Sequence, residues 1–375
     1  MSESNLNIPD FEVYLDYDKY IPHYLKLEKN DLDTNNFINA TLNCLTNINS
    51  FLEYIYKFNE ISNPPTYFKI LYNEIKQIFS NIENKNKKYN PEQFAKLIFY
   101  LFEKQSNQHD PRTLIDYIFN FFLNKNKNEI QESIAGKTDG KSDCNYLKID
   151  DSSYNELDCN FIETKKIDIK KLKEDKLEII IEKVQTCQNE KCREISKFYK
   201  HFPTLHFYLN PNSEKEYTLG DCFNEFFKKE NEESEYICSK CSKINKCESK
   251  SSFCQIPKSL IIFIYYENKN NEELKEFYYK FEKEIDFSNS NYISDDIKSK
   301  KYFLSSIIEC KSPKKNNEHF YTFCRKENNS KFLIYNTNEK DVRDHGKNVD
   351  RQTARLKNEP PEKRGYPYVL VYTEL

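Results

Sequence analysis

The clearest pattern of apolar and polar positions lies between residues 34 and 52, where apolar side chains recur at steps of four and three. They fall at Ile38, Leu42, Leu45 and Ile48. This spacing places them along one stripe of a helix, which predicts an amphipathic helix packed against a core. Thr34, Asn35 and Asn36 suit the start of this helix, because short polar side chains accept hydrogen bonds from the free amides of the first turn.

Helical periodicity continues through the first third of the chain, at residues 68–82, 93–103 and 111–123. Pro91 comes just before the second of these segments, where proline suits a first helical turn. Residues 1–22 show no clear period, and we expect them to form an N-terminal arm. Residues 124–158 are polar and charged, which predicts an exposed loop or insertion. The first third is therefore expected to be mainly helical.

Strands dominate the pattern after residue 176. Apolar runs predict strands at 177–184, 204–209, 259–266 and 302–310, with one short helix at 219–227. Residues 341–364 form a long charged insertion to which the sequence assigns no role.

Composition and charge limit the classes of partner. The 375 residues carry 57 basic and 60 acidic side chains, and the net charge is −3. The two signs are interspersed, so no overall field favours nucleic acid or an anionic membrane. The N-terminus is polar and the longest apolar runs are too short to span a bilayer. With twelve cysteines but no secretion signal, we expect a soluble protein in a reducing compartment, the cytoplasm or the nucleus.

Two short cysteine pairs indicate a metal site. Cys187 and Cys192 are separated by four residues, and Cys238 and Cys241 by two. Each pair can lie on a tight turn that aims both sulfurs at one point, and four thiolates suit a tetrahedral structural Zn²⁺. Cys247 and Cys254 could compete as ligands, and four free thiols in a reduced protein are the alternative.

The stretch Asn36-Phe37-Ile38-Asn39-Ala40-Thr41-Leu42-Asn43-Cys44-Leu45 resembles the cysteine box of the ubiquitin-specific proteases, N-T-C-Y-M-N-(S/A)-x-L-Q-x-L. Asn39, Ala40, Leu42 and Leu45 fix the register, and the family's nucleophilic cysteine then falls on Asn36. A thiolate at a helix N-terminus attacks a carbonyl, whereas an amide nitrogen does not. Cys44 lies eight residues further on, about 12 Å along a helix, and does not replace it.

Later segments resemble further parts of this family in the same order. Gln108 and Asp110 match the family's Q-Q-D box, but the match is weak. A helix cap at Asp110 followed by Pro111 explains the same residues without any function. The second cysteine pair and the proline-led strand after Pro257 are similar to the family's (Y/F)-x-C-x-x-C and L-P-x-x-L segments. Residues 318–325, 331–337 and 366–372 resemble its histidine box, the following W-x-x-(F/Y)-(D/N)-D strand and its last strand.

The resemblance implies an α+β, papain-like ubiquitin-specific protease fold. After the arm at 1–22, it implies one domain at 23–375, divided into a helical thumb at 23–175, zinc-bearing fingers at 176–258 and an antiparallel palm sheet at 259–375. Ubiquitin or a ubiquitin-like protein is the expected partner.

The resemblance also implies the roles of single residues. His319 takes the place of the general base, and Asn336 takes the place of the residue that orients it. Asp31 falls where the family has the asparagine that stabilises the oxyanion, and a carboxylate there repels the developing charge. Glu318 replaces the glycine before the histidine.

Three functional hypotheses follow. The first is a pseudo-deubiquitinase that binds ubiquitin or a ubiquitin-like modifier without cleaving it. The second is a structural module of a larger assembly that no longer binds ubiquitin. The third is an active thiol-dependent deubiquitinase, which requires a different register at Asn36. We expect them in that order.

Overall fold

The computed structural model describes the helical and strand-bearing parts of the chain in separate ranges. These are residues 36–57, 71–78, 94–98, 110–119, 122, 162–163, 177–209, 217–230, 235–238, 240–242, 244–266, 279–290, 292–294, 297, 299–311, 319–325, 331–336, 343–348 and 365–375. The N-terminal arm at 1–22, the polar segment at 124–158 and Asp31 lie outside them.

The first predicted helix is two helices. Helix α1 runs over Asn36–Leu45 and α2 over Asn49–Lys57. Between them, the side chains of Thr46 and Asn47 donate hydrogen bonds to the backbone carbonyl of Asn43, at 3.0 and 2.8 Å. Side chains that bond to nearby carbonyls compete with the helix ladder, which explains why the apolar period continues although the helix stops.

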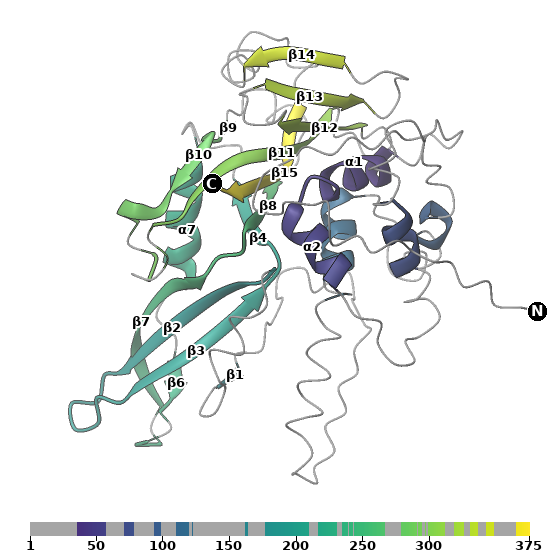
Figure 1. The fold of residues 1–375 in the computed structure, drawn as a ribbon. Helices are drawn as coiled ribbons and strands as arrows, with labels where there is room; N and C mark the ends of the chain where they lie inside the picture. The colour runs from purple at the N-terminus through teal and green to yellow at the C-terminus, as the bar shows by residue number, and fades with distance from the viewer. Residues whose placement is uncertain are drawn as a thin grey trace, which may run out of the picture.

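Further helices of the first third are described at 71–78, 94–98 and 111–119, inside the predicted segments. Their apolar side chains are buried together with those of α1 and α2. Phe51 stacks on Phe119 with ring centroids 4.8 Å apart, and its edge contacts Phe122. Aromatic rings therefore fill the centre of the helical layer, which lies beside the sheet in Figure 1.

The palm is an eight-stranded sheet. Along the sheet the order is β14-β13-β12-β11-β15-β8-β4, and β10 also pairs with β11. The bounds are β4 Leu205–Leu209, β8 Ser259–Tyr266, β10 Glu284–Asp286, β11 Lys301–Lys311, β12 His319–Arg325, β13 Lys331–Asn336, β14 Arg343–Asn348 and β15 Gly365–Glu374. All these pairs are antiparallel except β4 with β8, which is parallel. Part of the charged segment 341–364 thus adds strand β14 to one end of the sheet.

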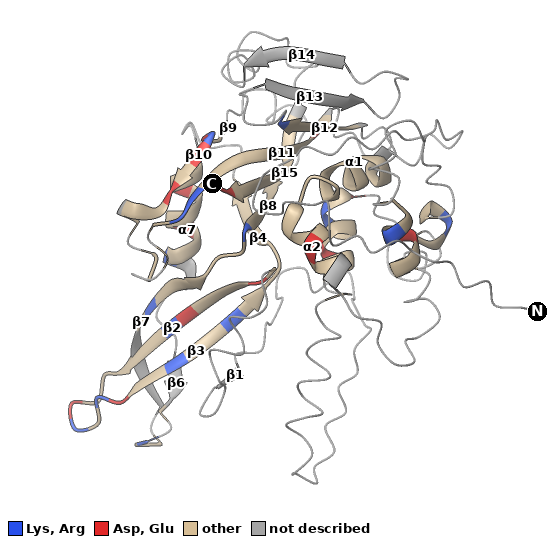
Figure 2. Ribbon diagram, viewed as in Figure 1, with Lys and Arg blue, Asp and Glu red and all other residues tan. Residues whose placement is uncertain are grey.

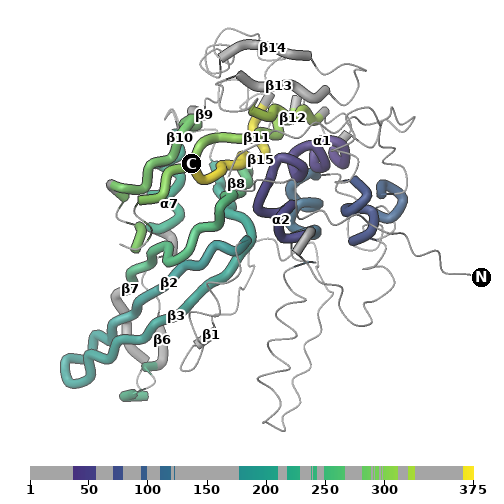
Figure 3. The backbone as a smooth tube through the Cα atoms, in the orientation of Figure 1, coloured from purple at the N-terminus to yellow at the C-terminus, as the bar shows by residue number. Residues whose placement is uncertain are grey.

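A second sheet extends away from the palm as the fingers (Figures 1 and 3). Its strand order is β1-β3-β2-β7-β6. The bounds are β1 Ile162–Glu163, β2 Ile179–Cys187, β3 Ile195–Phe202, β6 Glu235–Ile237 and β7 Ile244–Gln255. Strands β3 and β7 were not predicted, because they are rich in Lys and Ser and lack a continuous apolar run. A short pair, β5 Tyr217–Thr218 with β9 Tyr279–Lys280, completes the strands.

Helix α7, Leu219–Glu230, covers the face of the palm opposite the helical layer. Alternate residues of β4 show this, because side chains alternate between the faces of a strand. Phe207 packs edge-on against Phe223 of α7, 5.2 Å between ring centroids. Thr204, just before β4, instead donates to Asp116 of the helix at 111–119, at 2.7 Å.

Charged side chains of both signs are spread over the described surface, including the finger strands β2, β3 and β7 (Figure 2). This agrees with the interspersed charges of the sequence. No helix among the described residues is long and apolar enough to cross a membrane.

Candidate functional site

The positions that the resemblance assigns to catalysis lie where α1 meets the palm. Asn36 is the first residue of α1. The helix packs on β12, where the buried hydroxyl of Thr322 donates to the backbone carbonyl of Ala40 at 3.0 Å. The thiol of Cys324, two residues along β12, points to the carbonyl of Asn43 at 3.8 Å. These contacts fix the helix against the strand that carries the predicted general base.

The predicted histidine and its orienting residue lie on neighbouring strands. His319 begins β12, opposite Lys311 of β11. Asn336 ends β13, opposite Tyr321 of β12. The backbone therefore brings positions 319 and 336 to the same end of two paired strands. The side chains of Asn36, His319 and Asn336, and all of Asp31, lie outside the described residues, so their roles remain predictions.

Two thiols lie close to this junction, and neither is a plausible nucleophile. Cys44 of α1 and Cys324 of β12 are fully buried. Burial raises the pKa of Cys44 well above its usual value, and the nearby Cys324 raises it further. Burial also raises the pKa of Cys324 to about 12, against a smaller opposing effect of the Ser306 hydroxyl. Both groups are protonated at neutral pH, and the thiol form is a poor nucleophile.

The weakly matched Q-Q-D segment has a clear structural role. Asp110 caps the helix at 111–119, because its side chain accepts a hydrogen bond from the backbone amide of Arg112 at 2.8 Å. This confirms the interpretation of Asp110 as a helix cap followed by a first-turn Pro111. Gln108 lies outside the described residues. Sequence reasoning missed Arg112, which is charged but almost fully buried beside Asp110.

The four cysteines predicted as metal ligands come together at the tip of the fingers. The Sγ atoms of Cys187, Cys192, Cys238 and Cys241 all lie within 4.8 Å of one another. The Sγ distance is 3.9 Å from Cys187 to Cys241 and 3.7 Å from Cys192 to Cys238. A tetrahedral Zn²⁺ with Zn–S bonds of about 2.3 Å requires sulfurs about 3.8 Å apart. The spacing therefore fits this ion.

The backbone on both sides of the cluster turns sharply. Arg193 and Ser242 follow the second cysteine of each pair, and both have positive φ angles of 47° and 53°. The amide of Ser242 donates to the carbonyl of Cys238 at 2.8 Å, and the amide of Arg193 to that of Asn189 at 3.0 Å. These turns aim two sulfurs each at one point. The four intervening residues of the first pair are accommodated in this way.

Hydrogen bonds favour a thiolate at one position of the cluster, Cys238, whereas the pKa values of Cys187 and Cys192 are raised. Hydrogen bonds from the backbone amides of Cys241 and Lys240, and from neighbouring cysteines, lower the pKa of Cys238 to about 6 against its burial. Lys240 also forms an ion pair with Glu194 at 2.9 Å, which joins the two turns. Zinc binds thiolates, so this environment suits metal binding.

Of the two competing cysteines, Cys254 alone has a described side chain, and it lies outside the cluster. Cys254 lies on β7 and is absent from the group of four. Cys247 is the register partner of Cys187 on β7, and its side chain lies outside the described residues.

A model of the family described as ubiquitin carboxyl-terminal hydrolase matches residues 29–372, nearly the whole chain. The chain belongs to the ubiquitin carboxyl-terminal hydrolase family. Membership agrees with the fold, because the helical layer, the fingers and the palm follow the family order predicted from the motifs. No curated protein sequence matches the chain significantly.

Among solved structures, the chain is similar to a structure of the SAGA deubiquitinating module. That structure contains Ubp8, Sgf11, Sus1 and Sgf73 bound to monoubiquitin. The sequence identity is 14% and the TM-score is 0.52. The match covers 96% of this chain and 70% of the matched chain. At this identity the likeness concerns the fold, and it confirms the predicted α+β, papain-like ubiquitin-specific protease architecture.

Proposed function

We propose that this member of the ubiquitin carboxyl-terminal hydrolase family is a pseudo-deubiquitinase, which binds ubiquitin or a ubiquitin-like protein without cleaving it. The observation that carries the proposal is the position of Asn36 as the first residue of α1, the helix that packs on the strand beginning at His319. A side-chain amide at this point has no nucleophilic sulfur and forms no acyl-enzyme.

The state of the nearby thiols supports the loss of hydrolysis. Cys44 is buried and its pKa is raised, so the thiolate that an active enzyme requires is strongly disfavoured. Cys324 is buried in the same way, and its pKa is about 12. For either of these two thiols to act as the nucleophile, it would have to leave the core and ionise, which the packing of α1 on β12 opposes.

Retained architecture supports a binding role. The helical layer, the palm and the extended fingers are all present, and the four cysteines that stabilise the finger tip are in place. The structurally similar Ubp8 module was solved with monoubiquitin, which makes ubiquitin the first candidate partner. In this proposal the fingers, held by Zn²⁺ at Cys187, Cys192, Cys238 and Cys241, face a bound ubiquitin fold.

The second candidate is a structural module of a larger assembly that has lost ubiquitin binding. The similar structure contains Sgf11, Sus1 and Sgf73 beside Ubp8, which shows this architecture within a multiprotein module. The proposed location is the cytoplasm or the nucleus, and it is supported because none of the nine described cysteines forms a disulfide.

One experiment tests both candidates. Purified zinc-loaded protein is titrated with ubiquitin while affinity and hydrolysis of a C-terminal ubiquitin amide are followed. Saturable binding without hydrolysis is expected. Absence of binding by a folded, zinc-loaded chain would favour the structural module, and hydrolysis at any measurable steady rate would overturn the proposal.

A further inference from the structure

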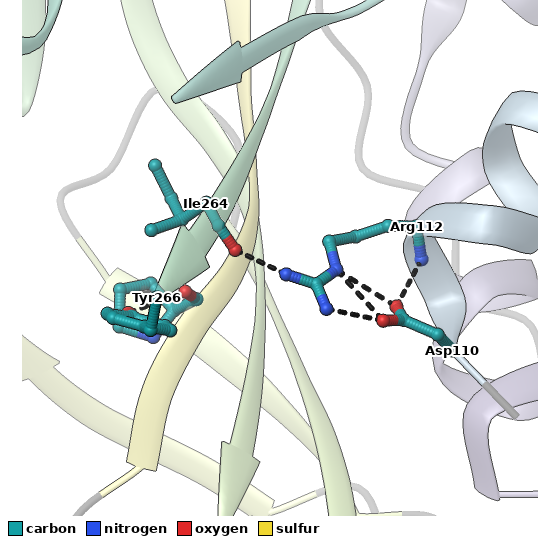
Figure 4. A network of polar contacts seen from close by, with 5 residues as sticks. Asp110, Arg112, Ile264 and Tyr266 are labelled. Atoms are coloured by element: carbon teal, nitrogen blue, oxygen red, sulfur yellow. Dashed lines mark hydrogen bonds and ion pairs between the residues drawn. The ribbon is translucent and has the colours of Figure 1, made fainter. Parts of the chain in front are cut away.

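A buried guanidinium joins the helical layer to the palm. Arg112, near the start of the helix at 111–119, is only 2% exposed. Its side chain leaves the helix and donates a hydrogen bond to the backbone carbonyl of Ile264 in β8 (Figure 4). Almost fully buried arginines are rare, so this contact requires an explanation.

Asp110 neutralises the charge in a fixed geometry. The Oδ1 atom of Asp110 accepts hydrogen bonds from the backbone amide of Arg112 at 2.8 Å and from the Nε of Arg112 at 3.1 Å. Its Oδ2 accepts from Nε at 3.0 Å and from a terminal nitrogen of the same guanidinium. The helix cap and the ion pair therefore share one carboxylate, which fixes the plane of the guanidinium relative to the start of the helix.

Two tyrosine rings enclose the guanidinium. The Cζ atom of Arg112 lies 4.2 Å from the ring centroid of Tyr265 in β8 and 4.2 Å from that of Tyr368 in β15. These strands are neighbours in the palm. A planar guanidinium satisfies both rings, the carbonyl and the carboxylate together, whereas a lysine ammonium has neither the plane nor the fork of donors.

The contact continues to the strand of the predicted general base. Tyr368 also packs against Phe320 of β12, edge to face, with ring centroids 5.5 Å apart. Phe320 is fully buried and follows His319 directly. The ring that covers Arg112 thus also contacts the start of strand β12.

We propose that Arg112 is a positioning residue that clamps the start of the helix at 111–119 to strands β8 and β15. Through Tyr368 and Phe320, the same residue holds the start of β12, the strand on which α1 packs. Apolar packing by Leu114 and Ile115 already attaches the helix to the core. A buried ion pair adds little net stability but strongly restricts geometry, so its role here is placement. The effect on a bound partner rests on the proposed function.

Native-state hydrogen exchange tests the clamp without any partner. Arg112→Lys keeps the charge and Arg112→Met removes it. We expect amide exchange in 111–119 and 319–325 to be about tenfold faster in Arg112→Met and less affected in Arg112→Lys, because the loss of one buried anchor promotes local opening. Exchange in the fingers, β2 and β3, should be unchanged. Equal acceleration in the fingers, or no change in 319–325, would overturn the proposal.

Two further variants keep the test decisive if Arg112→Met does not fold. Arg325→Lys is the matched control, because Arg325 also lies over a ring, 4.5 Å from the centroid of Phe303, but on the strand itself. It should leave exchange in 111–119 unchanged. Phe320→Leu removes the ring of β12 that Tyr368 contacts. It should accelerate amide exchange in 319–325 but not in 111–119. Acceleration in both segments would contradict the proposed order of contacts.

Ubiquitin affinity then connects the clamp to function. If the natural chain binds ubiquitin, Arg112→Met should weaken binding about tenfold, Arg112→Lys should weaken it less, and Arg325→Lys should leave it unchanged. Unchanged affinity in Arg112→Met would overturn the role of the clamp in binding. If the natural chain does not bind ubiquitin, the proposed function fails, whereas the exchange results still decide whether Arg112 is a clamp.

Discussion

At the scale of single residues, the N-terminus of α1 determines whether the molecule can be an enzyme. The helix dipole and free amides that would stabilise a thiolate are provided by the fold, but position 36 is an asparagine. The sulfurs that the chain does place nearby, on Cys44 and Cys324, are buried and protonated. In the proposed register, the N-terminus of α1 thus keeps the environment of a thiolate without the cysteine.

Asn36→Cys should therefore restore part of the lost chemistry. We expect slow labelling by a ubiquitin probe with a thiol-reactive C-terminus and poor turnover, because Asp31 and Glu318 still oppose the oxyanion and crowd the substrate tail. Removing one oxyanion donor typically costs about 10²–10³ in rate. Adding Asp31→Asn and Glu318→Gly should increase both the rate of labelling and the rate of turnover.

The natural chain is the control for this series, and it should stay unlabelled. Adding Cys44→Ala to Asn36→Cys should leave labelling unchanged. Labelling of the natural chain that free ubiquitin blocks would show that another cysteine reacts. A folded, zinc-loaded triple variant that neither labels nor binds ubiquitin would exclude the binding function.

A second prediction concerns the contact that holds α1 on β12. Thr322→Val removes the hydroxyl that donates to Ala40 and leaves a buried carbonyl without that donor. We expect a loss of about 1–3 kcal/mol in the free energy of unfolding, measured by urea denaturation. The control is Thr186→Val, at a partly buried position of strand β2. It should change the free energy of unfolding by less than about 0.5 kcal/mol. Equal effects of the two substitutions would show that the contact with α1 is unimportant.

At the scale of elements, the tip of the fingers extends beyond the paired strands as two turns with positive φ angles. The ion pair of Lys240 with Glu194 joins these turns. We propose that a Zn²⁺ at the four sulfurs joins them more firmly, because one ion would bind residues from two distant segments.

Protein purified without chelator should accordingly contain one Zn²⁺ per chain. Cys238→Ser should lose the metal and accelerate hydrogen exchange in β2, β3 and β7, with smaller changes in the palm, because a closed zinc site contributes directly to local folding. Cys254→Ser, on finger strand β7, is the matched control and should retain zinc. Zinc retained by Cys238→Ser would mean that the ligands are different residues.

At the scale of the whole molecule, the core combines isoleucine and leucine with many phenylalanine and tyrosine rings, and the chain has no tryptophan. Several tyrosines are buried with their hydroxyls bonded to backbone carbonyls. Tyr302 donates to Pro257 at 2.9 Å and Tyr372 to Glu282 at 2.7 Å. Burial raises the pKa of both hydroxyls above the usual value, and nearby glutamates add to the effect. The folded state therefore keeps these protons at a pH where the unfolded chain loses them.

Stability should then fall as the pH rises above about 10, the pKa of an unperturbed tyrosine. The folded state binds more protons than the unfolded state in this range, so each such tyrosine contributes about 1.4 kcal/mol of destabilisation per pH unit. Urea denaturation between pH 9 and about 12 measures the slope. Tyr302→Phe should reduce it by one proton, and an unchanged slope would contradict the buried titration of Tyr302.

The sequence by itself determined most helices and the strongly apolar strands, and it named candidate positions for the site. Periodicity gave the helices and the strongly apolar strands, because burial imposes a repeat on the side chains. Cysteine spacing identified the four members of the cluster, because two tight turns require close pairs. Family motifs assigned roles to positions 36, 319 and 336, and the structure places these positions at the ends of α1, β12 and β13.

Only the tertiary structure decided features that depend on contacts between distant segments. The break between α1 and α2 comes from local side-chain bonds that the apolar period does not reveal. Strands β3 and β7 form because pairing partners are available, although their own composition is polar. Arg112 looks like an ordinary surface charge in sequence. Its burial follows from the carbonyl and the two rings that β8 and β15 bring to it, which no local pattern encodes.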